Sequence, residues 1–170
     1  RLVQKAPVPP QHSSVHTDPA LADFAVWLSG KGRADDAEAA RELGSLSAVG
    51  LEKELAGPVG ERNIYALHPR GRVLLAPESE GGLYRQLAAA LATGNQAVID
   101  EATGLRAALK DIPASVAARV SWTSDWNKDG PFAAALLEGR AERIRTLNKA
   151  IAALDGPLVL VQSATAAEIE

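Results

Sequence analysis

The stretch from residue 71 to residue 100 reads GRVLLAPESEGGLYRQLAAALATGNQAVID. An apolar run at 73–76 precedes a turn, apolar residues then recur at helical spacing over 83–92, and a second apolar run follows at 97–99. This pattern predicts a strand, a helix and a second strand. About twenty residues separate the two apolar runs, which is enough for one crossover helix and too many for a hairpin loop, so we expect the strands to be parallel.

The remaining chain continues the same alternation of strands and helices. Further strands are predicted at 64–67, 117–122, 132–137 and 158–161, and further helices at 105–112 and 141–154. Alternation of this kind is typical of an α/β protein. We therefore predict an open, mainly parallel Rossmann-like sheet with helices on both faces, preceded by a linker and short helices.

The N-terminal third shows turn formers and then helix signals. Residues 1–17 are predicted to be a linker that follows a preceding domain, and His12 and His16 within it are interpreted as solvated loop histidines. Asp18 and Pro19 mark the start of a helix that ends at Gly30.

Two more helices are predicted at 34–43 and 48–55. The domain division is therefore 1–17 linker, 18–56 helical segment and 57–170 α/β domain. A capping-box pattern from Thr165 to Glu168 predicts the start of another helix, so the α/β domain is interpreted as truncated at its C-terminal end.

Length, charge and composition exclude several classes of function. The 170 residues fit one domain plus a leader, and the net charge of −3 argues against a nucleic-acid-binding surface. No apolar run approaches the roughly 18 residues that span a bilayer, and no signal peptide precedes the first helix, so a soluble, intracellular protein is expected. The chain contains no cysteine, which excludes disulfides and a cysteine nucleophile. It also lacks an initial methionine and is interpreted as an excerpt of a longer polypeptide.

The expected ligand edge of the sheet lacks the usual chemistry. Glu78 and Glu80 occupy the turn after the first central strand, where they would repel a phosphate. No glycine-rich nucleotide motif, phosphate-binding loop or serine elbow is present. The acidic pairs at 35–36 and 100–101 are interpreted as solvated charge. By its own residues, the segment is a poor candidate for a self-sufficient enzyme.

The candidate site is a group of charged and polar residues around two turns, at Glu61, Arg62, Asn63, Arg70 and Arg72. Because guanidinium groups bind carboxylates and phosphates bidentately, the group could be an anion site or an interdomain clamp. Salt bridges within the group itself are an equally good interpretation at this stage. The pair Trp122 and Trp126 is interpreted as core or interface packing rather than as a stacking platform for bases or sugars.

Several motifs carry a family resemblance. The passage LATGNQAVI at 91–99 resembles the AxxAGNxVV helix-to-strand passage of the aldehyde dehydrogenase cofactor-binding domain. The passages GPVGERNIYALHPRGRVLL at 57–75 and DGPLVLVQ at 155–162 are similar to the C-terminal aldehyde-dehydrogenase-like domain of long bifunctional proline-utilisation (PutA) proteins. The opening residues resemble the passage that leads out of the catalytic aldehyde dehydrogenase domain of these proteins. The resemblance covers nearly the whole chain.

The resemblance implies a role in proline catabolism. The parent polypeptide would be a cytoplasmic bifunctional oxidoreductase, in which an FAD-dependent proline dehydrogenase and an NAD-dependent semialdehyde dehydrogenase together oxidise proline to glutamate. The segment itself would be a non-catalytic domain that covers the substrate-channelling tunnel and contacts the catalytic domains of the same polypeptide. A homo-oligomer is left open.

The chain also departs from the family pattern. It lacks the cysteine nucleophile, and it carries Asp100 and Glu101 where aldehyde dehydrogenases carry lysine and proline. We therefore expect no catalytic residue, metal or cofactor in this segment. The alternative is a cryptic NAD- or nucleotide-binding module, and DNA binding is the weakest hypothesis.

Overall fold

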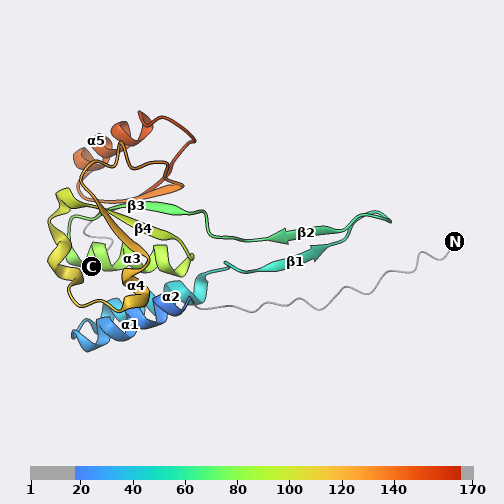
Figure 1. The fold of residues 1–170 in the computed structure, drawn as a ribbon, viewed down its shortest axis with the longest axis horizontal. Helices are drawn as coiled ribbons and strands as arrows, with labels where there is room; N and C mark the ends of the chain where they lie inside the picture. The colour runs from blue at the N-terminus through green and yellow to red at the C-terminus, as the bar shows by residue number, and fades with distance from the viewer. Residues whose placement is uncertain (1–17, 166–170) are drawn as a thin grey trace.

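A computed structural model describes residues 18–165 as a three-layer α/β fold. A five-stranded sheet forms the middle layer, helices cover both of its faces, and a two-stranded hairpin extends far from the body (Figure 1). The predicted fold class is confirmed. None of the helices within 18–165 is long and apolar enough to cross a membrane.

The helices and strands alternate after an N-terminal helical pair. The α-helices are α1 (Pro19–Gly30), α2 (Ala34–Leu46), α3 (Glu80–Ala92), α4 (Ala114–Ala117) and α5 (Ala141–Ala152). Two short 3-10 helices are η1 (Glu101–Thr103) and η2 (Leu105–Leu109). The strands are β1 (Glu52–Leu55), β2 (Asn63–Ala66), β3 (Arg72–Ala76), β4 (Gln96–Asp100), β5 (Val120–Thr123), β6 (Ala134–Glu138) and β7 (Leu160–Ala164).

The predicted strand, helix and strand over residues 71–100 are β3, α3 and β4. The two strands pair in parallel, with Val73 opposite Ala97. Asn95, only 7% exposed, fixes the turn between α3 and β4 because its Oδ1 accepts from the backbone N–H groups of Arg70 and Gly71 at 2.8 and 2.9 Å. This side chain joins the end of the helix to the entry of β3, so the two parallel strands begin in register.

The sheet has the order β5-β4-β3-β6-β7, and all its neighbouring pairs are parallel. The chain runs outward from β3 to β5, returns to the other side of β3, and runs outward again through β6 and β7. The point where the direction reverses lies between β3 and β6. In open α/β sheets, ligands bind at this place, outside the carboxyl ends of the strands.

Two hydrophobic cores lie on opposite faces of the sheet. On one face, α1, α2 and α3 cover β3 and β4, with Phe24, Leu28, Leu75, Leu87 and Ile99 fully buried. On the other face, Ile151 of α5 packs with the strand residues Leu74, Val98, Ala135 and Leu137. Trp122 packs against the first core and Trp126 against the second, which confirms the packing interpretation of the two tryptophans.

The start of α1 was predicted correctly. The Asp18 carboxylate accepts from the Ala20 N–H at 2.8 Å and also pairs with Arg119 at 2.7 Å. This cap therefore also ties the first helix to the residue that precedes β5.

Some predicted elements were wrong. Residues 52–55 form strand β1 rather than the end of a helix over 48–55, because they pair with β2 in antiparallel register. The helix predicted over 105–112 is a shorter 3-10 helix, and the helix predicted over 34–43 continues to Leu46. The linker at 1–17, with its two histidines, and residues 166–168 of the predicted capping box lie outside the described residues.

Candidate functional site

The hairpin carries three of the five predicted site residues. Glu61 and Arg62 lie in the loop at its tip, and Asn63 is the first residue of β2, opposite Leu55 of β1. All three are exposed. The guanidinium Nε of Arg62 donates to Oε2 of Glu54 across the hairpin at 3.3 Å. An exposed pair of this kind contributes only about 0–1 kcal/mol. The Arg62 side chain is 70% exposed, so its charge is accessible.

Exposed apolar side chains accompany this charge. Eight large hydrophobic residues within 18–165 are exposed, and four of them belong to the hairpin: Leu55, Val59, Ile64 and Tyr65. Val59, at the tip, is fully exposed and is not shielded by any other residue in the part of the chain that the structure describes. A soluble protein seldom concentrates apolar side chains on a projecting element unless another surface covers them. The hairpin has the composition of a contact element.

Arg70 and Arg72 lie apart from the tip, where the chain enters the sheet. The Arg72 guanidinium stacks over the Phe132 ring at 5.3 Å from its centroid and donates to the carbonyl of Asp129. Arg70 is exposed beside the turn that Asn95 holds. The structure therefore does not assemble the predicted group into one anion site. It separates Glu61, Arg62 and Asn63 on the hairpin from two arginines at its base.

A buried carboxylate fills the switch point between β3 and β6. Glu138 ends β6 and is only 1% exposed. Its Oε2 accepts from the N–H groups of Glu78 and Ser79 at 2.7 and 3.0 Å, and its Oε1 accepts from the Ser79 hydroxyl at 2.6 Å. Backbone N–H groups at a helix N-terminus are the donors that hold a phosphate in nucleotide-binding folds. Here an anion supplied by the chain itself occupies these donors.

The surrounding residues are shaped around this carboxylate. Ser79 caps α3 by accepting from the Gly82 N–H at 2.9 Å. A Cβ at position 82 would lie 1.7 Å from Oε2 of Glu138, so only glycine leaves room for the carboxylate. Arg143 donates to the carbonyl oxygens of Glu138 and Pro77 at 3.0 and 3.2 Å and thereby joins the ends of β6 and β3. Contacts within the chain therefore fill the switch point between β3 and β6.

Sequence reasoning missed Glu138. The sequence drew attention to Glu78 and Glu80 at this turn, and both side chains are exposed, whereas the buried carboxylate at the turn belongs to Glu138. The available signal was a glutamate at the end of an apolar strand, next to Gly139. Its partners lie 59 and 60 residues earlier in the chain, which only the paired sheet reveals.

The acidic pair at 100–101 is also partly corrected. Asp100 is 8% exposed, and its Oδ1 accepts from the Ala102 N–H at 3.0 Å, so it caps η1 rather than lying in solvent. Glu101 is exposed and pairs with Arg106. No group of three or more histidine or acidic side chains in the described part of the chain could hold a metal ion.

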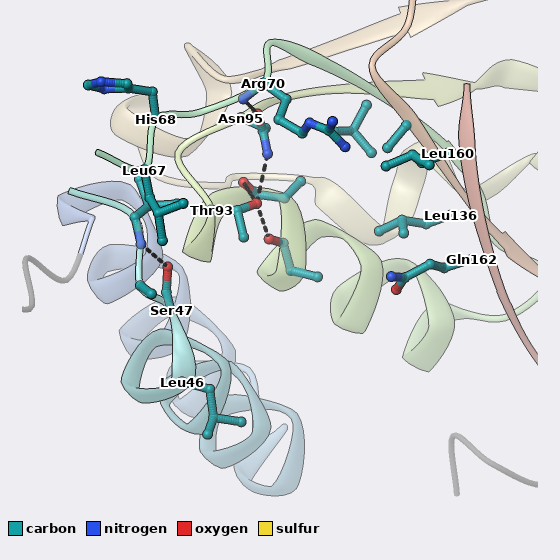
Figure 2. Close-up of a pocket in the computed structure, with 16 residues that line it drawn as sticks. Leu46, Ser47, Leu67, His68, Arg70, Thr93, Asn95, Leu136, Leu160 and Gln162 are labelled. Carbon is teal, nitrogen blue, oxygen red and sulfur yellow. Dashed lines mark hydrogen bonds between the residues drawn. The ribbon is translucent and has the colours of Figure 1, made fainter. Parts of the chain in front are cut away.

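A largely apolar cavity of about 440 Å³ lies at the opposite end of α3 from Glu138. Figure 2 shows Leu136, Leu160 and Gln162 projecting from β6 and β7 toward α3, with Leu46 and Ser47 from the end of α2 on another side. His68 and Arg70 lie along its margin, and both are exposed. No cluster of acid, base and nucleophile lines it, so its chemistry fits packing against another surface better than catalysis.

Sequence comparison identifies relatives that are much longer than this chain. No protein-family model matches. A protein named bifunctional protein PutA from Rhizobium meliloti is 68% identical over 169 residues, which cover 99% of this chain and 14% of that protein. A second protein of this name, from Salmonella typhimurium, is 39% identical over 123 residues, which cover 72% of this chain and 9% of that protein. The chain thus spans a small part of the length of its curated relatives.

Structural comparison gives the same fold. A crystal structure of a variant of Bradyrhizobium japonicum proline utilization A is 25% identical, has a TM-score of 0.61, and aligns with 88% of this chain and 19% of its own. An NAD-dependent benzaldehyde dehydrogenase from Corynebacterium glutamicum is 19% identical with a TM-score of 0.50, over 85% of this chain and 37% of its own. At that identity the second likeness concerns the fold alone.

Proposed function

This chain is homologous to one segment of the bifunctional PutA proteins, as the resemblance in its sequence predicted, and from this premise we propose that it is a non-catalytic interaction domain of a longer bifunctional enzyme. The longer polypeptide oxidises proline to glutamate by a proline dehydrogenase that uses FAD and a semialdehyde dehydrogenase that uses NAD. The segment covers the tunnel through which the intermediate passes between the two sites. Its partners are the catalytic domains of the same polypeptide.

The observation that carries this proposal is the projecting hairpin. Four exposed apolar side chains and the accessible Arg62 lie on an element that contributes nothing to either hydrophobic core. Burying such side chains stabilises an interface by roughly 25 cal/mol per Å² of apolar surface. The hairpin therefore supports a role in which the segment packs against another domain and keeps water from a reactive intermediate.

The closed switch point supports the non-catalytic part of the proposal. Glu138 uses the backbone donors that a dinucleotide phosphate would need, and a second anion at that place would meet a buried negative charge. The chain also has no cysteine, the nucleophile of aldehyde dehydrogenases. Both features support the proposal that the reactions that use FAD and NAD take place in other domains.

The test is a longer polypeptide in which residues 52–66 are replaced by an Asn-Gly turn. The Leu67 N–H donates to the Leu51 carbonyl at 2.9 Å, so these two residues already stand at the spacing that a two-residue turn can join. We expect each half-reaction to stay within about twofold of its original rate, while coupled turnover falls about fivefold or more and acquires a lag, because the intermediate escapes to bulk solvent.

A matched pair of single substitutions separates the hairpin from general surface effects. Val59→Ser removes an exposed valine from the hairpin tip, whereas Val26→Ser removes an exposed valine from α1. Only the first should impair coupling. Coupled turnover without a lag in the polypeptide that lacks the hairpin would contradict the proposal.

A further inference from the structure

Strand β7 presents an open edge. Among the described residues it pairs only with β6, in parallel. The Gly139 N–H donates to the Ala164 carbonyl at 3.2 Å, so the backbone groups of Ala164 face β6. Because successive residues of a strand point their N–H and C=O groups to opposite sides, Gln162 also faces β6, whereas Val161 and Ser163 point theirs away from the sheet.

The edge lacks the features that usually prevent a strand from recruiting another. Its sequence is LVQSA, which contains no charge and no proline. Open edges in natural proteins are normally blunted by lysine, proline, a bulge or a covering segment. Leu160 is also 53% exposed beside it. An edge of this composition fits a strand that another strand covers.

An apolar groove adjoins this edge. The cavity of about 440 Å³ and a second one of about 170 Å³ both lie between α3 and the strands β6 and β7, and they share Ala89, Leu136 and Gln162 in their linings. Ala89 has a small side chain that leaves space beside α3, and the Leu136 side chain is only half-buried. A strand added beside β7 would place alternate side chains over this groove.

A buried acceptor without a partner lies in the second cavity. Gln86 is 7% exposed and lines this cavity, and its Oε1 has no hydrogen-bond partner among residues 18–165. Leaving a buried acceptor unsatisfied destabilises a protein by roughly 1–3 kcal/mol, so native structures seldom keep one. The groove therefore provides an acceptor for a donor that the described residues do not supply.

We propose that β7 and this groove bind an extended segment from another part of the longer polypeptide, which adds a sixth strand to the sheet. The segment has apolar side chains at alternate positions and one donor side chain that reaches Gln86. The relative with 68% identity is about seven times longer than the matched part, so ample chain exists to supply it, and a tethered segment binds at a high effective concentration. The proposal rests on the longer polypeptide of the proposed function, but it concerns a surface distinct from the hairpin and does not depend on the role given to the hairpin.

Hydrogen exchange at single-residue resolution in the full-length polypeptide tests this directly. We expect the amides of Val161 and Ser163 to exchange about 100-fold or more slowly than unprotected amides, at rates similar to Gln162. Gln162 is the internal control because its N–H faces β6 with or without the added strand. Fast exchange at Val161 and Ser163 together with slow exchange at Gln162 would overturn the proposal. Protection that disappears on dilution would also overturn it, because the covering strand would then come from a second copy.

Gln86→Met tests the buried acceptor. Methionine keeps the shape of the side chain and removes its hydrogen-bonding groups, so protection at Val161 and Ser163 should fall about tenfold while protection at Gln162 is retained. Gln96→Met, at an exposed position at the start of β4, is the matched control and should change neither. Unchanged protection in the Gln86→Met protein would overturn the contact with the incoming donor.

Discussion

Replacing Glu138 with alanine should destabilise the domain strongly. The fully buried carboxylate accepts two backbone N–H groups and one hydroxyl. Hydrogen bonds to a charged group each contribute about 1.5–3 kcal/mol, and the three are not additive because they share one side chain. Loss of the carboxylate also leaves the N–H groups of Glu78 and Ser79 without their acceptor. We expect a loss of about 3–5 kcal/mol in the free energy of unfolding.

Glu138→Gln divides this loss into charge and acceptor contributions. The amide oxygen can still accept from both backbone N–H groups, while the amide nitrogen faces the Ser79 hydroxyl and the negative charge at the helix N-terminus is lost. A loss of about 1–2 kcal/mol is expected. Urea unfolding followed by tryptophan fluorescence measures both variants. Glu142→Ala, at an exposed position in the first turn of α5, is the control and should stay within about 0.5 kcal/mol.

Inorganic phosphate provides a second measurement on the same variants. In Glu138→Ala the backbone donors are free, so millimolar phosphate should raise the unfolding midpoint more than it does in the original protein. The effect of phosphate on the original protein is subtracted, because phosphate also stabilises proteins generally by being excluded from their surface. The reasoning would be refuted if Glu138→Ala unfolded at the same urea concentration as Glu142→Ala, or if phosphate stabilised the original protein and the Glu138→Ala variant equally.

Three further substitutions test the packing around the site and the central strands. At an ordinary helix position, replacing glycine with alanine would increase helix propensity. At position 82 the added Cβ would lie 1.7 Å from Glu138 Oε2, so we expect Gly82→Ala to lower the free energy of unfolding by about 2 kcal/mol or more. Gly30→Ala, where no atom lies within 4 Å of the added Cβ, should change it little. Burial raises the pKa of the Tyr84 phenol above 10.0, and the Glu80 carboxylate adds to this. The folded state therefore favours the neutral phenol, and this stabilisation is complete below about pH 10 and is lost as the pH rises through the folded-state pKa. Tyr84→Phe should reduce the fall in the urea midpoint between pH 9 and about pH 11.5. The same fall in the variant and in the original protein would contradict this prediction. Asn95→Ala removes the acceptor for two backbone N–H groups and should lower the free energy of unfolding by about 2–3 kcal/mol in the same urea assay, and a loss under about 0.5 kcal/mol would show that β3 and β4 are held in register without it.

Local patterns predicted the central unit well. The apolar runs of β3 and β4, the helical spacing of α3 and the length between the strands are all properties of one contiguous stretch, so periodicity captured them. The start of α1 followed from Asp18 and Pro19 for the same reason.

Elements that depend on distant partners were missed. Residues 52–55 read EKEL, which favours a helix locally, and they become a strand only because β2 lies beside them. Glu138 likewise looked like an ordinary charged residue at a strand end. Its burial depends on donors in the turn after β3, which come close only once β3 and β6 pair. The five predicted site residues lie in two separate places because Glu61, Arg62 and Asn63 are at the far end of the hairpin, whereas the two arginines are at its base.

The central claim is that this segment contributes a surface and binds no dinucleotide. Calorimetric titration of NAD into the full-length polypeptide, and into the same polypeptide without residues 18–165, tests it most directly. The account predicts the same number of NAD molecules bound per chain in both proteins. A decrease of one NAD per chain when the segment is removed would contradict it.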